Sequence, residues 1–353
     1  MLQLNYLVRK ADERQVVTVT LWCIFLMVVL DIPSIRRTPF ILVDCGAREF
    51  SLDQNISRAF PTLTLVGFEP DRDECARLNR MGNEQRIFFP VAVGEREETR
   101  TLHVTRSPEC SSLLLPNVEF FGKFHDTEKS VEVVADKQVQ VVSLDKYLPS
   151  SGISQIDFLK LDVQGVELEI LRGSESFLKS GILGMLIEVE FSPIYRNQPL
   201  FADVDNYTRI YSFMLFDLSR VYYRRKVMSR EIDTRGQLVY GDALYLRDYR
   251  YFVERSMKLE AMKLAVLASA YGFHDYALEI VQFLLGEGNM LTDTERADLE
   301  KAHRSYRNRL TGGRSTLETL LELRIVGPLL QKATNTFVVA NGRIERRRFA
   351  WAD

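Results

Sequence analysis

The sequence has few cysteines and histidines, and neither residue type is spaced for a metal site or for disulfides. The four cysteines show no paired spacing: they are Cys23, Cys45, Cys75 and Cys110. Scattered cysteines fit reduced thiols in a cytoplasmic protein better than a disulfide framework or a zinc site. The four histidines form no HxxH or HExxH pattern, so a histidine-rich metal site is not expected.

The sequence also lacks an excess of charge of either sign. It has 46 Lys and Arg residues against 48 Asp and Glu residues, which gives a formal net charge of -2. A general nucleic-acid surface needs clustered positive charge, so we expect no nucleic-acid partner. The length of 353 residues predicts one large domain with an appendage, or two domains.

The most apolar stretch is too short for a membrane-spanning helix. It is VVTVTLWCIFLMVVL at residues 16–30, whereas such a helix needs roughly 20 residues. It also lacks the small-residue cleavage site of a signal peptide. The stretch could be a buried helix or strand that packs on the domain, a membrane-surface or weak signal-anchor segment, or the product of a mis-called start. The first interpretation is favoured, so membrane contact is the less favoured one.

Two buried strands open the central part of the chain. Residues 40–46, FILVDCG, are an apolar run that ends in an acid and a glycine, as in the first strand of a nucleotide-binding α/β unit. No GxGxxG follows it, which argues against a dehydrogenase. Residues 63–70, LTLVGFEP, end in Glu69, whose carboxylate can accept hydrogen bonds from both hydroxyls of a ribose. A helix at 71–80 and a third strand at 87–94 are predicted next.

Residues 157–171, DFLKLDVQGVELEIL, predict a buried strand, a turn and a helix. Asp162 lies near the carboxyl end of this strand, where open α/β sheets hold their ligands. The alternative is that Asp162 caps the following helix. Gly165 relaxes the turn.

A further buried strand is predicted at residues 184–191, with Glu188 and Glu190 on the same face. From about residue 251 the pattern becomes helical and forms a separate appendage. The other expected elements are strands at 101–105, 139–144 (which ends at Asp145), 213–218 and 242–247, and helices at 207–213, 257–270, 276–285, 292–310 and 315–330.

In this order, the motifs resemble the FkbM family of S-adenosylmethionine-dependent methyltransferases. The matching residues are VDCGA at 43–47, GFEP at 67–70, AVG at 92–94, LD at 144–145, DFLKLDVQGVELEILRG at 157–173, IEVEF at 187–191, Tyr195 with Gln198, and GDAL at 241–244. The resemblance covers about residues 40–248. It implies an α/β fold with a Rossmann-like seven-stranded sheet, followed by a C-terminal helical appendage. The expected boundaries are 1–38, 39–249 and 250–353.

The resemblance implies S-adenosylmethionine as the cofactor, bound at the carboxyl ends of the strands. The residues implied are Asp44, Gly46 and Ala47 in the first loop, Glu69 at the ribose, Ala92 and Val93 at the adenine, and Asp162 where the methyl group is presented. One departure stands out. The family's first motif usually has the form GANxG, but Arg48 and Phe50 replace the asparagine and the second glycine. This predicts a reshaped loop, weaker cofactor binding or a member that no longer catalyses.

A sugar hydroxyl is a poor nucleophile, so methyl transfer to it calls for a general base. The candidates are Asp162, which takes this role or orients the acceptor, then Glu167 and Glu188, and last His103 or His125. Alternatively, Glu167 is a favourable charge at a helix N-terminus, and Glu188 and Glu190 form a salt bridge at the sheet edge. Asp162, Glu188 and Glu190 could hold a divalent cation, although the favoured expectation is no metal.

We therefore expect an O-methyltransferase that acts on a hydroxyl of a glycan or related metabolite. The alternative is a non-catalytic Rossmann-like binding module with a helical region that docks a partner. Residues 250–353 could serve as a homo-oligomer or protein-partner surface. Their helix-loop-helix piece resembles one helical-repeat unit, and one copy does not establish an array.

Overall fold

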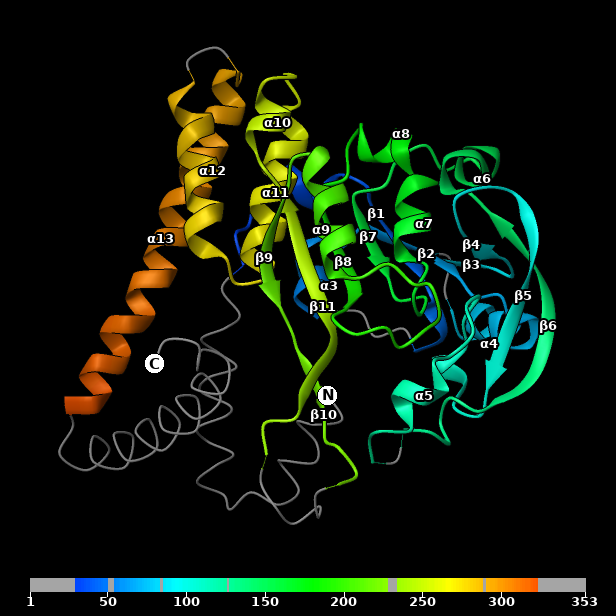
Figure 1. Cartoon of the computed structure of the whole chain (residues 1–353). Helices are drawn as coiled ribbons and strands as arrows, with labels where there is room; N and C mark the ends of the chain where they lie inside the picture. Colours follow the sequence, from blue (N-terminus) through cyan, green and yellow to red (C-terminus); the bar gives the residue numbers. More distant parts are fainter. Residues whose placement is uncertain are drawn as a thin grey trace. The chain divides into compact units, whose positions relative to one another are not determined.

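The computed structural model describes residues 29–49, 54–82, 85–125, 127–227, 234–287 and 290–322. The chain divides into two compact units (Figure 1): one runs from Ser34 to Leu264, and the other combines the residues before 34 with those after 264. Nearly all of the apolar stretch at 16–30 lies outside the described residues. The boundaries expected at 38/39 and 249/250 stay a prediction.

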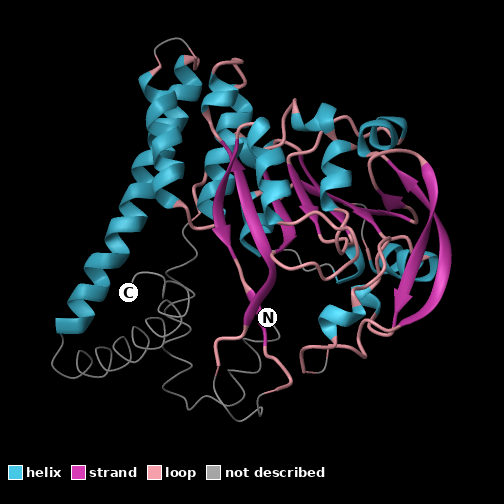
Figure 2. Cartoon of the chain, viewed as in Figure 1, coloured by secondary structure: helices cyan, strands magenta, loops and turns pink. Residues whose placement is uncertain are grey.

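The larger unit is built on a mostly parallel sheet (Figure 2). Seven strands follow the order β3-β2-β1-β7-β8-β11-β9, and a short eighth strand, β10, pairs with β11 beside β9. β1 is parallel to β2 and β7, and β7 is parallel to β8, whereas β11 runs antiparallel to β8 and β9. Their bounds are β1 Phe40–Cys45, β2 Leu63–Phe68, β3 Arg86–Phe89, β7 Phe158–Leu161, β8 Gly184–Glu190, β9 Phe213–Leu218, β10 Val221–Tyr223 and β11 Gln237–Arg247. This confirms the expected Rossmann-like α/β sheet.

The sequence forms these strands because the sheet is covered on both faces. β1 is buried at five of its six positions, and β8 is buried at six of seven. A strand in such a place needs apolar residues in succession rather than in alternation. Val43, Leu159 and Ile187, from three adjacent strands, all have 0–1% exposure and lie in one core cluster. The exceptions to this pattern are therefore informative: Asp44, Glu188 and Glu190 are acids in the same buried strands.

Helices connect the strands of this sheet. They are α3 Gln54–Ala59, α4 Arg72–Met81, α6 Leu144–Ser150, α7 Glu167–Arg172, α8 Glu175–Leu178 and α9 Phe201–Ile210, with the short α5 Val118–Phe121 and α10 Arg250–Val253. The 3-10 turns are η1 Ile35–Arg37, η2 Ala47–Glu49 and η3 Pro108–Cys110. α4 begins where the sequence predicts, because Asp71 caps it by accepting the backbone N–H groups of Asp73 and Glu74.

Two of the predicted strands were wrong in extent. The strand expected at 87–94 is split at Pro90: β3 stays in the main sheet, while β4 Ala92–Val93 joins a second sheet of order β4-β6-β5. Proline has no N–H for a strand ladder. The strand expected at 139–144 is the end of β6 Val133–Val142, and Asp145 lies inside α6. β6 and β5 Glu98–Thr105 run side by side in Figure 1.

The helical predictions were partly wrong. The helix expected at 207–213 is α9, which begins at Phe201 and ends at Ile210. α11 Lys258–Ala270 and α12 His274–Gly286 match their predictions closely. α13 Asp293–Glu322 continues through the break expected between helices at 292–310 and 315–330, and residues 323–330 lie outside the described residues. In the smaller unit, the Tyr306 hydroxyl lies 2.6 Å from His274 Nδ1. Among the residues that the structure describes, no helix is long and apolar enough to span a membrane.

Candidate functional site

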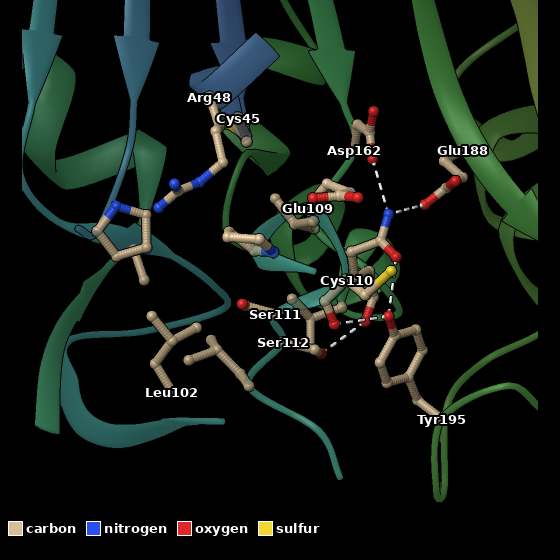
Figure 3. A pocket seen from close by; sticks show the side chains of 18 of the residues that line it. Cys45, Arg48, Leu102, Glu109, Cys110, Ser111, Ser112, Asp162, Glu188 and Tyr195 are labelled. Carbon is tan, nitrogen blue, oxygen red and sulfur yellow. Dashed lines mark hydrogen bonds between the residues drawn. The ribbon is translucent and has the colours of Figure 1, made fainter. Parts of the chain in front are cut away.

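A pocket of about 300 Å³ opens at the carboxyl ends of β1, β2, β7 and β8 (Figure 3). Six predicted site residues line it: Gly46, Glu69, Ala92, Val93, Asp162 and Glu188. Three others do not. Asp44 and Ala47 are fully buried next to the first loop, and Glu167 is buried at the start of α7. The fold therefore gathers most of the predicted residues, which are far apart in the sequence, around one cavity.

The first loop needs glycine because it packs against the backbone that follows β7. Gly46 has a φ of +89°, and a Cβ there would lie 1.9 Å from the carbonyl oxygen of Asp162. Backbone hydrogen bonds fix both sides of this approach. The Gly46 N–H donates to the Phe68 carbonyl and the Asp162 N–H donates to the Cys45 carbonyl, each with an N···O distance of 3.1 Å. The loop after β1 and the carboxyl end of β7 are thereby held together at the floor of the pocket.

An acid and a lysine pair beneath this floor. Lys160 Nζ lies 3.1 Å from Asp44 Oδ1 and 3.8 Å from Asp162 Oδ2. The Asp44 side chain has no exposure, and its Oδ2 has no hydrogen-bond partner. Burial raises the pKa of Asp44, while Lys160 lowers it in part. Burial alone would lower the pKa of Lys160, but the two carboxylates raise it overall. Lys160 is therefore a charged lysine that balances two acids.

Glu69 lies at the end of β2 and is 4% exposed. Its Oε1 accepts the backbone N–H of Asp71 at 2.8 Å, and Arg48 Nη2 lies 3.6 Å from the same oxygen. Arg48 is also 3.9 Å from Asp71 Oδ2, which Lys137 approaches to 2.9 Å. Burial raises the pKa of Glu69, whereas the Asp71 N–H and Arg48 lower it. The sequence shows Arg48 as a departure from the family's first motif, but it does not show that Arg48 faces Glu69.

The turn after β7 is held in a left-handed shape. Gln164 has a φ of +64° and Gly165 a φ of +105°. The Glu167 carboxylate accepts the N–H of Val163 at 3.0 Å and that of Gly165 at 3.0 and 3.2 Å. Burial raises the pKa of Glu167 to about 7, although these N–H groups lower it. Glu167 thus braces the turn and lies outside the pocket lining, which favours the structural alternative for this residue.

Gln164 joins two of the acids that line the pocket, Asp162 and Glu188 (Figure 3). Its Nε2 donates to Asp162 Oδ1 at 2.9 Å and to Glu188 Oε2 at 2.5 Å. Its Oε1 accepts the Tyr195 hydroxyl at 2.8 Å, and its backbone carbonyl accepts the Ser112 hydroxyl at 2.6 Å. The carboxylates of Asp162 and Glu188 fix which way the amide faces, because only the amide nitrogen can donate to them. The sequence analysis gave Gln164 no role, since nothing in a pattern shows where its side chain points.

Glu188 and Glu190 lie two positions apart on β8 and share a face, as predicted. Together with Glu167 they form a buried group in which one oxygen of each lies within 4.8 Å of the others. Burial first, and then neighbouring carboxylates, raise the pKa values of Glu188 and Glu190 well above the ordinary range. Among the described residues, neither acid pairs with a lysine or arginine, so the alternative of a salt bridge at the sheet edge finds no support there.

Comparison with known proteins decides the family of this region. Residues 44–215 match the family model of the methyltransferase FkbM domain. The chain contains an FkbM methyltransferase domain. A curated relative, methyltransferase sdnD of Sordaria araneosa, is 27% identical over 166 residues. That match takes in 40% of this chain and 63% of the relative, so the chain spans under two thirds of its length.

Solved structures resemble the FkbM domain more distantly. A crystal structure of methyltransferase FkbM from Methylobacillus flagellatus is 13% identical, with 66% of this chain and 55% of that chain covered and a TM-score of 0.35. TrmK of M. capricolum, in complex with S-adenosyl-homocysteine, is 9% identical, with 81% and 98% covered and a TM-score of 0.30. The fold assignment therefore rests on the strand order of the chain itself.

The histidines proposed as late candidates for a base lie elsewhere in the FkbM domain. His103 is on β5, and its Nδ1 lies 2.8 Å from Asp136 of β6. Neither His103 nor His125 lines the pocket. Of the residues predicted as a general base, Asp162 and Glu188 are the ones that line the pocket.

Proposed function

We propose that the FkbM domain is an S-adenosylmethionine-dependent methyltransferase that methylates a hydroxyl of a glycan or related metabolite. The observation that carries this proposal is the pocket itself. One cavity joins Glu69, suited to a ribose, to Asp162 and Glu188, suited to hold a hydroxyl and take its proton. The family match and its position at residues 44–215 support the proposal.

The residues present fit the cofactor. Glu69 uses one carboxylate oxygen for the Asp71 N–H and has a second for a ribose hydroxyl. Ala92, Val93 and Leu102 give an apolar wall for an adenine. Asp44 Oδ2 is buried without a partner beside the first loop, so this acid adds negative charge beneath the pocket floor. When bound, S-adenosylmethionine supplies a methyl group on a positively charged sulfur, which the acidic lining would favour.

Asp162 and Glu188 divide the work. Asp162 lies beside Lys160 and accepts from Gln164, so it is placed to accept a hydrogen bond from the acceptor hydroxyl and orient it. Glu188 has no cationic partner in the described part of the chain, so it has the greater affinity for a proton. Transfer of the methyl group to the hydroxyl oxygen would release the hydroxyl proton, which Glu188 in its ionised form would accept. Positioning alone can lower the barrier by several kcal/mol.

The first test is calorimetric titration of the purified protein with S-adenosylmethionine, S-adenosylhomocysteine and NAD. We expect the two sulfur compounds to bind and NAD not to bind. Glu69→Ala should abolish binding, because it removes the carboxylate that would bind the ribose. Glu119→Ala, an exposed acid on α5 whose side chain is 89% accessible, is the matched control and should bind as the native chain does. No binding of either sulfur compound would instead favour the non-catalytic binding module.

Two further expectations stay predictions. The cytoplasmic location rests on the cysteines, of which Cys45, Cys75 and Cys110 are free thiols in the described part of the chain. A homo-oligomer or protein partner at residues 250–353 would be tested by light scattering of the intact chain.

A further inference from the structure

The pocket has a second half, formed by different elements from those expected to hold the cofactor. Tyr223 lies on β10, Tyr240 on β11, Phe121 on α5, and Ile194 and Tyr195 follow β8; all five line the cavity. Figure 3 shows Tyr195 across the pocket from Arg48. Glu188 also lines the pocket from the sheet, so an acceptor in this half would meet the acid that takes its proton.

The aromatic side chains of this half are held in place by one another. Tyr223 packs edge-to-face against Tyr240, with ring centroids 6.1 Å apart and an interplanar angle of 80°. Phe121 lies 6.4 Å from Tyr223, and the Tyr195 hydroxyl is fixed by Gln164 and by the Cys110 carbonyl at 2.9 Å. Fixed aromatic walls with a few phenols suit a ligand that has an apolar face and hydroxyl groups. Burial raises the pKa of Tyr223 to about 12, so it stays a neutral donor.

The charge of the lining limits the ligand further. Five acids line the pocket: Glu69, Asp71, Glu109, Asp162 and Glu188. Arg48 is the one lysine or arginine among the lining residues that the structure describes, and it lies between Glu69 and Asp71. No lining cation thus faces the aromatic half. A phosphate or carboxylate brought there would lose its water without gaining an opposite charge, which is strongly unfavourable.

We propose that Tyr195, Tyr223, Tyr240, Phe121, Ile194 and Glu188 form the acceptor subsite, and that it takes uncharged, hydroxyl-bearing molecules with an apolar face. It rejects anionic acceptors, such as sugars joined to a nucleotide or carrying a carboxylate. This inference rests on the proposed methyl transfer and deepens it by naming the class of acceptor. Rejection comes from an unpaired buried charge, which is an efficient source of specificity.

Two probes that differ by a single carboxylate test the proposal. They are p-nitrophenyl β-D-glucopyranoside, which is neutral, and p-nitrophenyl β-D-glucuronide, which is anionic. Binding of each to the full chain is measured by saturation-transfer NMR in the presence of S-adenosylhomocysteine. We expect the neutral probe to bind at least about tenfold more tightly than the anionic one, because only the latter buries an unpaired charge.

Adjacent tyrosines on β10 supply the matched variants. Tyr223 lines the pocket, whereas Tyr222 is 37% exposed and does not, since neighbouring strand residues point to opposite faces. Tyr223→Ala should lower the affinity for the neutral probe by about fivefold or more, because the ring contact is lost. Tyr222→Ala should leave this affinity unchanged. Both variants should bind S-adenosylhomocysteine as the native chain does.

The outcomes separate this inference from the proposed function. If S-adenosylhomocysteine fails to bind the native chain, the proposed function fails and the acceptor subsite fails with it. If it binds but the two probes bind equally, the charge argument is overturned. If the neutral probe does not bind, or binds Tyr223→Ala as well as the native chain, the aromatic subsite is overturned.

Discussion

At the scale of single residues, the acids in and beneath the pocket depend on neighbouring side chains that donate hydrogen bonds to them or carry the opposite charge. Lys160 balances Asp44 and Asp162, and Gln164 links Asp162 to Glu188. Arg48 faces Glu69. Each of these acids is partly or wholly buried, and a buried carboxylate needs a donor or a cation to stay ionised. The partners therefore set which acids carry charge at neutral pH.

Arg48 should control the pH at which the cofactor is held. The proposed cofactor binding needs Glu69 as a carboxylate, and burial raises the pKa of Glu69 while Arg48 lowers it. Affinity should therefore fall as the pH drops through the pKa of Glu69. In Arg48→Asn that fall should begin at a higher pH, with little change at pH 8. Calorimetric titration of S-adenosylhomocysteine from pH 5 to pH 8 measures the midpoint.

The control for this prediction is Arg77→Asn, which removes an exposed arginine that pairs with Glu74 on α4 and should leave the midpoint in place. A midpoint that stays fixed or moves down in Arg48→Asn would contradict the role given to Arg48.

Gln164 should be the residue that lets Asp162 and Glu188 lie close together. Gln164→Glu replaces a double donor with a third acid, and like charges raise the pKa values of all three. Since these pKa values are then higher in the folded than in the unfolded chain, stability is lost as the pH rises above the unfolded value. We expect a melting temperature that falls more at pH 8 than at pH 5, corresponding to about 1–3 kcal/mol. Thermal unfolding at both pH values measures this.

Gln140→Glu serves as the comparison, because Gln140 is exposed on β6 and donates only to the Thr99 hydroxyl at 2.8 Å. It should show no such pH dependence. An equal loss of stability for Gln164→Glu at both pH values would mean that the amide acts only by packing.

At the scale of elements, the strands that build the pocket could be predicted and their contacts could not. β1, β2, β7 and β8 are buried on both faces, so each appears in the sequence as a mainly apolar run. The split of β3 from β4 at Pro90 depends on which sheet each half joins, which is a tertiary choice. α13 continues through Gly312 and Gly313, because glycines weaken a helix without ending it. The sequence likewise predicts where Asp162 and Glu188 lie on their strands. It does not predict that the Gln164 side chain links them, because that contact forms only when the two strands come together in the fold.

The close approach of the β1 loop to the end of β7 should depend on Gly46. Gly46→Ala places a methyl group 1.9 Å from the Asp162 carbonyl oxygen, so one of the two backbones must move. We expect a loss of at least about 3 kcal/mol in the free energy of unfolding, and loss of S-adenosylhomocysteine binding. Urea unfolding and calorimetry measure the two effects.

Gly152→Ala separates steric contact from backbone strain. Gly152 has a similar φ of +82°, but nothing lies within 4 Å of a Cβ there. It should cost only about 1–2 kcal/mol, the price of a left-handed alanine, and should bind the ligand normally. Equal costs for the two variants would show that the approach to Asp162 is not what requires a glycine.

At the scale of the whole molecule, the sheet is completed by a helix that lies beyond the family resemblance. Lys263 of α11 donates to Asp157 Oδ1 at 2.8 Å and to the Pro39 carbonyl at 2.7 Å. Its side chain is 3% exposed and that of Asp157 is fully buried. Asp157 directly precedes β7 and accepts the Ile41 N–H at 2.8 Å. The larger unit therefore includes the first half of α11, whereas the sequence analysis placed the whole helix in the C-terminal region.

This ion pair should make the larger unit depend on residues after 249. Lys263→Met leaves Asp157 buried without its cation and should lower the free energy of unfolding by about 3–5 kcal/mol. Asp157→Asn combined with Lys263→Met should recover part of that loss, because no unpaired charge remains and the two sites are coupled. Lys179→Met, at an exposed pair with Glu175, should cost no more than about 1 kcal/mol. Urea unfolding of the native chain, these three variants and Asp157→Asn alone decides the matter. If the destabilisation of the double variant equals the sum of the two single effects, the pair does not join α11 to the sheet.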